Sequence, residues 1–186
     1  MKLYGSYTSP FVRHCRIALL ESTLDYQFIE TDHATSAALS PTKRVPFLQD
    51  GELTLTDSSA ILRYIRSKSD KPFLESTVEL DQYCMINTAL DSTINLFFLS
   101  RDGVDIERFD YTIRQAQRIE STLMQLETFE LPLLHGPFND VQLRLACYLS
   151  WAIFRQRIHI ANYPKLKLFL AAVEKEPFFI ETAPQA

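Results

Sequence analysis

The chain has 186 residues, of which 46% are hydrophobic and 23% charged, as in an ordinary soluble globular protein. Its formal net charge of -4 at pH 7 offers no overall attraction for nucleic acid or for anionic membranes. No apolar run reaches the roughly 18 residues that a membrane span needs. We therefore expect no nucleic-acid partner and no membrane association.

Cysteine and histidine usage argues against a metal enzyme. The three cysteines, Cys15, Cys84 and Cys147, form no CxxC pair and have no metal-ligand spacing. The sequence holds no HExxH, P-loop or dinucleotide fingerprint, and its N-terminus lacks the layout of a signal peptide. Free, buried thiols in a reducing cytoplasm are the simplest interpretation. We therefore expect a cytoplasmic protein without a metal site.

Residues 1–68 alternate between strand and helix patterns. Apolar residues that recur at helical spacing from Val12 onwards predict an amphipathic helix that ends near Ser22. Gly51 lies at the centre of a hairpin signal, because glycine readily adopts the positive φ of such turns. The expected strands are residues 2–4, 26–30, 45–48 and 53–56, and further helical segments lie within 31–40 and from Asp57-Ser58 to Ser67. This order predicts an α/β domain with a mixed four-stranded sheet.

The second half has a different pattern. A polar stretch ending at Pro72 predicts a linker, and the strand-like alternation stops there. Asn139 and Gln142 have the spacing of a capping box at a helix start, and Pro177 is expected to stop the last helix. Tyr148, Trp151 and Phe154 are expected to point inward. Helical patterns cover roughly residues 75–100, 105–130, 139–158 and 163–175, so we expect domains at 1–68 and 75–186.

Ser9 is the first candidate functional residue. Pro10 suits the first turn of a helix, because its missing N–H would have no partner there. Ser9 then lies near the N-cap, where unpaired N–H groups and the helix dipole favour an anion. The plain interpretation is that Ser9 only caps the helix. Arg13 and His14 could add positive field, although solvated charges are the simpler interpretation.

Three motifs occur together in a set order: Thr8-Ser9-Pro10-Phe11, Ser40-Pro41-Thr42-Lys43-Arg44-Val45-Pro46-Phe47-Leu48 and Asp57-Ser58-Ser59-Ala60-Ile61. With a helical second half, the chain resembles the cytosolic glutathione S-transferases, in particular small bacterial members that carry a TSPFVR motif. The resemblance implies a thioredoxin-like N-terminal domain followed by an all-α C-terminal helical domain. It also implies a cytoplasmic homodimer with a role in detoxification.

The resemblance assigns roles to six residues. Ser9 matches the position of the catalytic serine or cysteine, and Pro46 matches a cis-proline before the third strand. Val45 matches the residue whose backbone pairs with the cysteinyl part of glutathione. The remaining three are Asp57 and Ser58 at the γ-glutamyl end and Arg44 near the glycyl carboxylate. Lys43 departs from the family, since a glycine is common there, and Asp57 replaces the more usual Glu or Gln.

The chemistry of glutathione agrees with these roles. Ser58 opens a helix, so its hydroxyl and N–H can hold a carboxylate at a positive dipole end. Asp57 can pair with the ammonium, and Arg44 offers a fork for the second carboxylate. A cis Val45-Pro46 bond would turn the amide groups of Val45 toward a peptide bound as an added strand. Taken alone, Asp57 as an N-cap and Arg44 as a solvated loop charge are equally good interpretations.

The mechanism that follows is thiol activation. A free thiol has a pKa near 8.5, so only about 3% of it is thiolate at pH 7. Ser9 would donate a hydrogen bond to the sulfur, and no base is arranged to make it a nucleophile. Tyr7 is an alternative donor, whereas Tyr4 and Cys15 are expected in the core. A stripe on the first helix of the second half could line a cleft or only pack: Tyr83, Asn87, Asp91, Asn95 and Phe98.

The sequence thus predicts a glutathione S-transferase that adds the glutathione sulfur to a small hydrophobic electrophile, with glutathione as co-substrate and no metal. Two alternatives stay open. One is a non-catalytic interaction protein with the same fold, resembling stringent starvation protein A. The other is a glutathione-dependent isomerase or peroxidase that uses the same site.

Overall fold

The computed structural model describes residues 1–132 and 137–184 of the chain. Its residues divide into two compact units, one formed by Met1–Glu75 together with Lys175–Ala186 and the other by Ser76–Glu174. The C-terminal segment therefore groups with the N-terminal unit in its contacts, whereas the sequence places it with the helical half. The domain boundaries expected from the sequence, 1–68 and 75–186, stay a prediction.

The first unit is built on a mixed four-stranded sheet in the order β2-β1-β3-β4. The central strand β1 (Lys2–Gly5) is parallel to β2 (Gln27–Glu30) and antiparallel to β3 (Phe47–Asp50). The hairpin strand β4 (Leu53–Leu55) is antiparallel to β3, with Gly51 at φ +60° in the turn. Tyr4 lies opposite Phe47, and their stacked rings are 4.4 Å apart.

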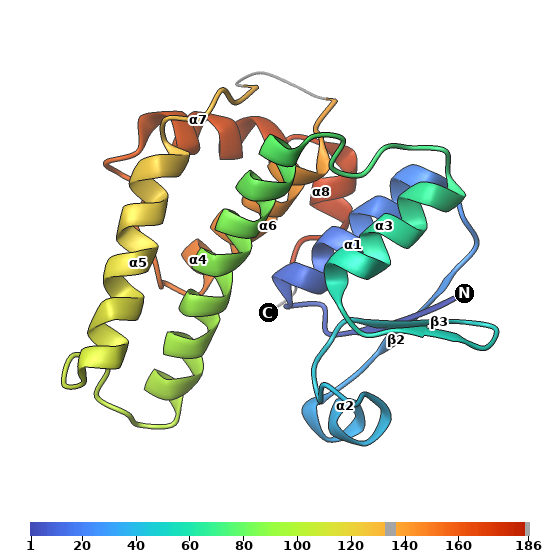
Figure 1. The fold of residues 1–186 in the computed structure, drawn as a ribbon, viewed down its shortest axis with the longest axis horizontal. Helices are drawn as coiled ribbons and strands as arrows, with labels where there is room; N and C mark the ends of the chain where they lie inside the picture. Colours follow the sequence, from blue (N-terminus) through green and yellow to red (C-terminus); the bar gives the residue numbers. More distant parts are fainter. Residues whose placement is uncertain (133–136, 185–186) are drawn as a thin grey trace. The chain divides into compact units, whose positions relative to one another are not determined.

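Three helices accompany this sheet. Figure 1 shows α1 (Pro10–Ser22) and α3 (Ser58–Lys68) side by side on one side of the sheet and α2 (His33–Leu39) on the other. The apolar residues of α1 predicted from their spacing are buried, including Val12 and Cys15. The expected thioredoxin-like α/β domain is therefore confirmed.

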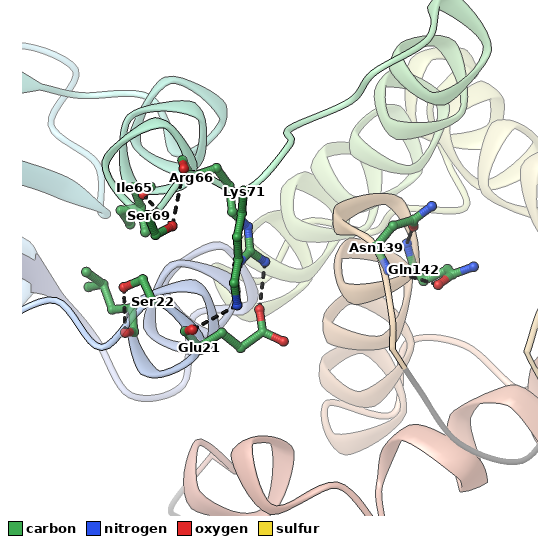
Figure 2. Close-up of polar contacts among 9 residues, drawn as sticks. Glu21, Ser22, Ile65, Arg66, Ser69, Lys71, Asn139 and Gln142 are labelled. Carbon is green, nitrogen blue, oxygen red and sulfur yellow. Dashed lines mark hydrogen bonds and ion pairs between the residues drawn. The ribbon is translucent and has the colours of Figure 1, made fainter.

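Charged side chains connect the C-terminal ends of α1 and α3 through an ion pair and a hydrogen bond. Arg66 on α3 forms an ion pair with Glu21 on α1 at 2.8 Å, and Arg66 is only 3% exposed. The Lys71 ammonium donates to the backbone carbonyl of Glu21 at 2.8 Å. Figure 2 shows both contacts converging on Glu21. Because a buried guanidinium needs its partner, these contacts fix the distal ends of the two helices whose N-termini carry the candidate site.

The second unit is helical, as expected. It contains α4 (Thr77–Arg101), α5 (Asp110–Leu126), α6 (Asp140–Phe154) and α7 (Pro164–Val173). The capping box at the start of α6 is confirmed: the Gln142 N–H donates to the Asn139 side chain and the Asn139 N–H donates to the Gln142 side chain, both at 3.0 Å (Figure 2). Tyr148 and Trp151 are buried.

Three expectations about individual residues are wrong. Phe154, the last residue of α6, is 42% exposed and does not point into the core. Cys84 is exposed, unlike the buried Cys15 and Cys147, since it lies about 100° around α4 from the buried Tyr83. Pro177 does not follow the end of α7 directly but begins a further short helix, α8 (Pro177–Glu181), at the position where a proline fits best.

Gly5 allows the close approach of β1 to α1. A Cβ at Gly5 would lie 2.5 Å from one methyl carbon of Val12 and 2.7 Å from the other. Val12 is fully buried, and its β-branched side chain has few alternative rotamers. The contact therefore requires glycine at the end of β1, directly before the loop that carries Ser9.

We expect Gly5→Ala to lower the free energy of unfolding by about 1–3 kcal/mol through overpacking against Val12. Urea unfolding of Gly5→Ala, Val12→Ala and the double variant measures this effect. The double variant should be more stable than the sum of the single effects predicts, by at least about 0.5 kcal/mol. If the changes in the free energy of unfolding caused by Gly5→Ala and Val12→Ala simply add, overpacking against Val12 is not the cause of the destabilisation.

Candidate functional site

The topology of the sheet brings three segments of the first unit to one edge. Because β1 and β3 are antiparallel, the end of β1 lies beside the start of β3, where Tyr4 pairs with Phe47. Likewise, Leu55 at the end of β4 pairs with Leu48 near the start of β3. The loop after β1, the segment before β3 and the segment after β4 therefore meet at this edge. These segments contain all six residues to which the sequence assigns a role.

Ser9 is the N-cap of α1, as expected. Its backbone is extended, and its hydroxyl oxygen accepts a hydrogen bond from the N–H of Val12 at 3.4 Å. Its hydroxyl hydrogen has no acceptor among the described residues, and the side chain is half-buried. A hydroxyl can accept and donate at once, so capping leaves Ser9 able to donate to a bound anion.

The Val45-Pro46 peptide bond is cis. The strand expected from Val45 begins two residues later, at Phe47. Val45 is half-buried, and its backbone N–H and C=O take part in no hydrogen bond between described residues. They are thus available to an added strand. Lys43 has φ +53°, which explains why a glycine is common there, since L side chains rarely adopt this conformation.

Asp57 is the N-cap of α3. Its Oδ1 accepts hydrogen bonds from the N–H groups of Ser59 at 2.8 Å and Ala60 at 3.2 Å. Its Oδ2 has no donor among the described residues, and the side chain is exposed. One oxygen therefore caps the helix while the other can meet a ligand ammonium. The interpretations of Asp57 as cap and as ligand are compatible.

Ser58 and Arg44 occupy contrasting environments. Ser58 is 6% exposed, and its backbone carbonyl accepts a weak hydrogen bond from the Cys15 thiol at 3.9 Å, which links the second turn of α1 to the start of α3. Arg44 is exposed on the loop before β3 and contacts no described acidic residue. The structure brings Ser9, Val45-Pro46 and Asp57-Ser58 to one edge of the sheet, with Arg44 on the rim.

Arg13 and His14 are buried, so their interpretation as solvated charges is wrong. Arg13 is 4% exposed and His14 is fully buried. The Arg13 guanidinium donates to the Phe179 carbonyl at 2.7 Å and to the Thr182 hydroxyl at 3.3 Å, and lies 3.6 Å from the Phe179 ring centroid. The C-terminal segment that covers Arg13 lies 166 residues away in the chain, so no local pattern could reveal the contact.

The tyrosines weighed from the sequence have clear environments. Tyr4 stacks on Phe47 and donates its hydroxyl to Gln49 at 2.8 Å, so it is engaged within the sheet. Tyr83 is buried and accepts a hydrogen bond from Arg144 within the helical unit, so it does not line a cleft. On the same stripe Asn87 is half-buried, and the other three residues, Asp91, Asn95 and Phe98, are exposed.

Residues 1–132 and 137–184 contain neither a cluster of metal ligands nor a helix that could span a membrane. Within these residues, no three His, Cys, Asp or Glu side chains gather closely enough to hold a metal ion. None of the helices described there combines the length and apolar character needed to cross a bilayer.

Comparisons with known sequences identify the first unit. Residues 3–73 match the family model of the glutathione S-transferase N-terminal domain. Glutathione S-transferase 4 of Zea mays is 37% identical over 98 residues, which cover 49% of this chain and 44% of that protein. The chain thus spans less than half the length of this maize relative. The uncharacterized GST-like protein YibF of Escherichia coli is 29% identical over 172 residues, 84% of each chain.

Comparisons with solved structures cover the whole chain. A glutathione S-transferase from Methylobacillus flagellatus with glutathione bound has a TM-score of 0.82 at 22% identity and covers 99% of both chains. The holo structure of maleyl pyruvate isomerase, a bacterial Zeta-class glutathione S-transferase, has a TM-score of 0.78 at 19% identity, covering 99% of this chain and 97% of that one. The chain therefore has the glutathione S-transferase fold, and the similarity of residues 3–73 to the glutathione S-transferase N-terminal domain agrees with it.

Proposed function

We propose that this chain is a glutathione-dependent transferase that activates the thiol of glutathione for addition to a small hydrophobic electrophile. The observation that carries the proposal is the position of Ser9, a half-buried hydroxyl with a donor hydrogen to spare at the start of α1. The fold agrees with it, since the Methylobacillus flagellatus structure of the same fold has glutathione bound. The homodimer, the cytoplasmic location and the detoxification role that the resemblance implies belong to the same proposal.

Glutathione would bind as an extra strand beside the start of β3. The unpaired backbone groups of Val45 would hydrogen-bond its cysteinyl part. Oδ2 of Asp57 would accept from the γ-glutamyl ammonium, while Ser58 would hold the neighbouring carboxylate at the start of α3. Arg44, exposed and without an acidic partner among the described residues, would meet the glycyl carboxylate.

Ser9 would stabilise the thiolate and not attack the electrophile itself. Lowering a thiol pKa by about 2 units requires about 2.7 kcal/mol of preferential stabilisation of the thiolate. A hydrogen bond to a charged group contributes about 1.5–3 kcal/mol, and the helix dipole adds about 0.3–1 kcal/mol. Together they suffice to bring the thiol pKa from about 8.5 to about 6.5. The thiolate then attacks the electrophilic carbon, and the sulfur–carbon bond forms as a π bond of the electrophile or its bond to a leaving group breaks. The displaced electron pair takes a proton from water or departs with the leaving group, and no covalent bond to the enzyme is made.

A second candidate is a glutathione-dependent isomerase. It is favoured by the Zeta-class maleyl pyruvate isomerase structure, which shares the fold at a TM-score of 0.78. In this chemistry glutathione is regained after the double bond has rotated, whereas a transferase consumes it. Incubation with maleylpyruvate tests for the isomerase, which should convert it without consuming glutathione. Incubation with chlorodinitrobenzene tests for the transferase, which should consume glutathione.

We expect Ser9→Ala to raise the pKa of enzyme-bound glutathione by about 1–2 units, because the thiolate loses one hydrogen bond. At pH 7 turnover should then fall about 3- to 25-fold, as the thiolate fraction falls. Because the thiol pKa is higher in the variant, its turnover should approach that of the native protein as the pH rises toward 9. Thiolate absorbance of the complex and kcat at several pH values measure both effects.

Ser67→Ala, which alters an exposed serine in the last turn of α3, is the matched control and should behave as the native protein. If Ser9→Ala leaves both the thiol pKa and turnover unchanged, Ser9 has no part in the mechanism. If the native protein is not retained on immobilised glutathione but captures a macromolecular partner, the transferase proposal is wrong and the interaction protein is supported.

Two variants of Asp57 separate capping from ligand binding. Asp57→Ala removes both the cap and the carboxylate, and should lower the free energy of unfolding by about 1 kcal/mol. Asp57→Ser keeps a good N-cap, so its stability should stay close to native while glutathione binding weakens a few-fold. Calorimetry and urea unfolding measure both quantities. Native affinity in Asp57→Ser would remove Asp57 from the glutathione site.

A further inference from the structure

Tyr7, Phe28 and Arg16 form a cluster on the side of β1 opposite to β3. The rings of Tyr7 and Phe28 are 4.8 Å apart. The guanidinium carbon of Arg16 lies 4.8 Å from the Tyr7 ring centroid and 5.3 Å from that of Phe28. Each member thus contacts the other two. We call this cluster the Arg16 clamp.

The three members come from different elements. Tyr7 is in the loop between β1 and α1, Phe28 is in the edge strand β2, and Arg16 is two turns into α1. The clamp therefore joins the loop that carries Ser9 to the two elements beside it. Since β2 and β3 flank β1 on opposite sides, the ring of Tyr7 is held away from Val45. This arrangement disfavours Tyr7 as the thiol donor.

Arg16 has no acidic partner in the described part of the chain. It forms no ion pair there, and its Nη1 atom is buried without a hydrogen-bond acceptor. A buried N–H without an acceptor is unfavourable, so the contacts with the two aromatic rings are what stabilise the guanidinium in this place. A side chain kept there only for solubility or surface charge would extend into water.

The loop itself is a short, internally bonded turn. The Ser9 N–H donates to the Ser6 carbonyl at 3.1 Å, and the Thr8 N–H donates to the Ser6 hydroxyl at 3.3 Å. Tyr7 lies at the centre of this turn, two residues before Ser9. Fixing the ring of Tyr7 therefore limits the conformations open to Ser9.

We propose that Arg16 is a positioning residue that holds Tyr7 against Phe28 and thereby aims the Ser9 hydroxyl at the thiol. The proposal rests on the proposed function for its consequence in catalysis. Its structural part, the ordering of the loop, does not require glutathione. Two independent readouts therefore separate a failure of the clamp from a failure of the transferase proposal.

The test compares Arg16→Lys, Arg16→Met and Phe28→Leu, with Arg63→Met on the exposed face of α3 as the matched control. Lysine keeps the positive charge but loses the planar group that covers two rings. Methionine keeps the aliphatic stem without the charge. Circular dichroism and urea unfolding first establish that each variant is folded.

The first readout is amide hydrogen exchange at Thr8 and Ser9 in the protein without ligand. Losing a cation–π contact of this kind should shift the equilibrium between the closed and open loop about 3- to 30-fold toward the open form. Amide exchange at Thr8 and Ser9 should therefore accelerate by that factor in all three clamp variants. The control should exchange at the native rate. Unchanged exchange at both amides in the clamp variants would overturn the proposal, whether or not the protein binds glutathione.

The second readout is the pKa of bound glutathione together with kcat and KM. All three clamp variants should raise the thiol pKa and lower kcat while KM for glutathione stays within about twofold, because Ser9 is misaligned while the peptide contacts persist. If the thiol pKa of glutathione bound to Arg16→Lys equals the native value, Arg16 acts through its charge alone and the clamp is contradicted. A native thiol pKa despite faster exchange contradicts it equally. A protein that binds no glutathione refutes the transferase proposal, and amide exchange then decides the clamp.

Discussion

The antiparallel pairing of β1 with β3 is the constraint on which the rest of the first unit depends. It places the end of β1 beside the start of β3, while the hairpin to β4 returns the chain to the same edge. Two helix N-termini and one stretch of unpaired backbone then meet where the strands stop. Such an edge suits an extended ligand that has a negative charge at each end and a thiol in the middle.

Three contacts hold the first two turns of helix α1. Gly5 lets β1 approach Val12 closely. The C-terminal segment covers Arg13 through the Phe179 carbonyl and ring, and Arg16 reaches back over the ring of Tyr7. A donor that must meet a developing thiolate benefits from such fixation, because preorganised groups need no rearrangement during the reaction.

The sequence predicts what depends on local patterns. The cap at Ser9, the cap at Asp57, the hairpin at Gly51 and the capping box at Asn139 all rest on residues within four positions of one another, and the structure confirms each. The fold class follows from the order of these elements. Lys43 shows that even a departure from a family pattern has a physical meaning, since it occupies a left-handed conformation.

The sequence could not predict what depends on distant partners. Arg13 and His14 read as surface charges because the segment that buries Arg13 begins more than 160 residues later. From the sequence, Tyr7 is a possible hydrogen-bond donor to the thiol. Only the order of the strands shows that Phe28, which Tyr7 contacts, and Val45 lie on opposite sides of β1. Cys84 is expected to be buried only because free cysteines usually are, whereas it lies beside the buried face of α4 that contains Tyr83, Ile86 and Leu90.

A crystal structure of the complex with glutathione would show whether Ser9 activates the thiol. We expect the sulfur to accept a hydrogen bond from the Ser9 hydroxyl, with the cysteinyl backbone paired to Val45. A sulfur that instead contacts the Tyr7 hydroxyl, or lies in bulk water with Ser9 turned away, would contradict it.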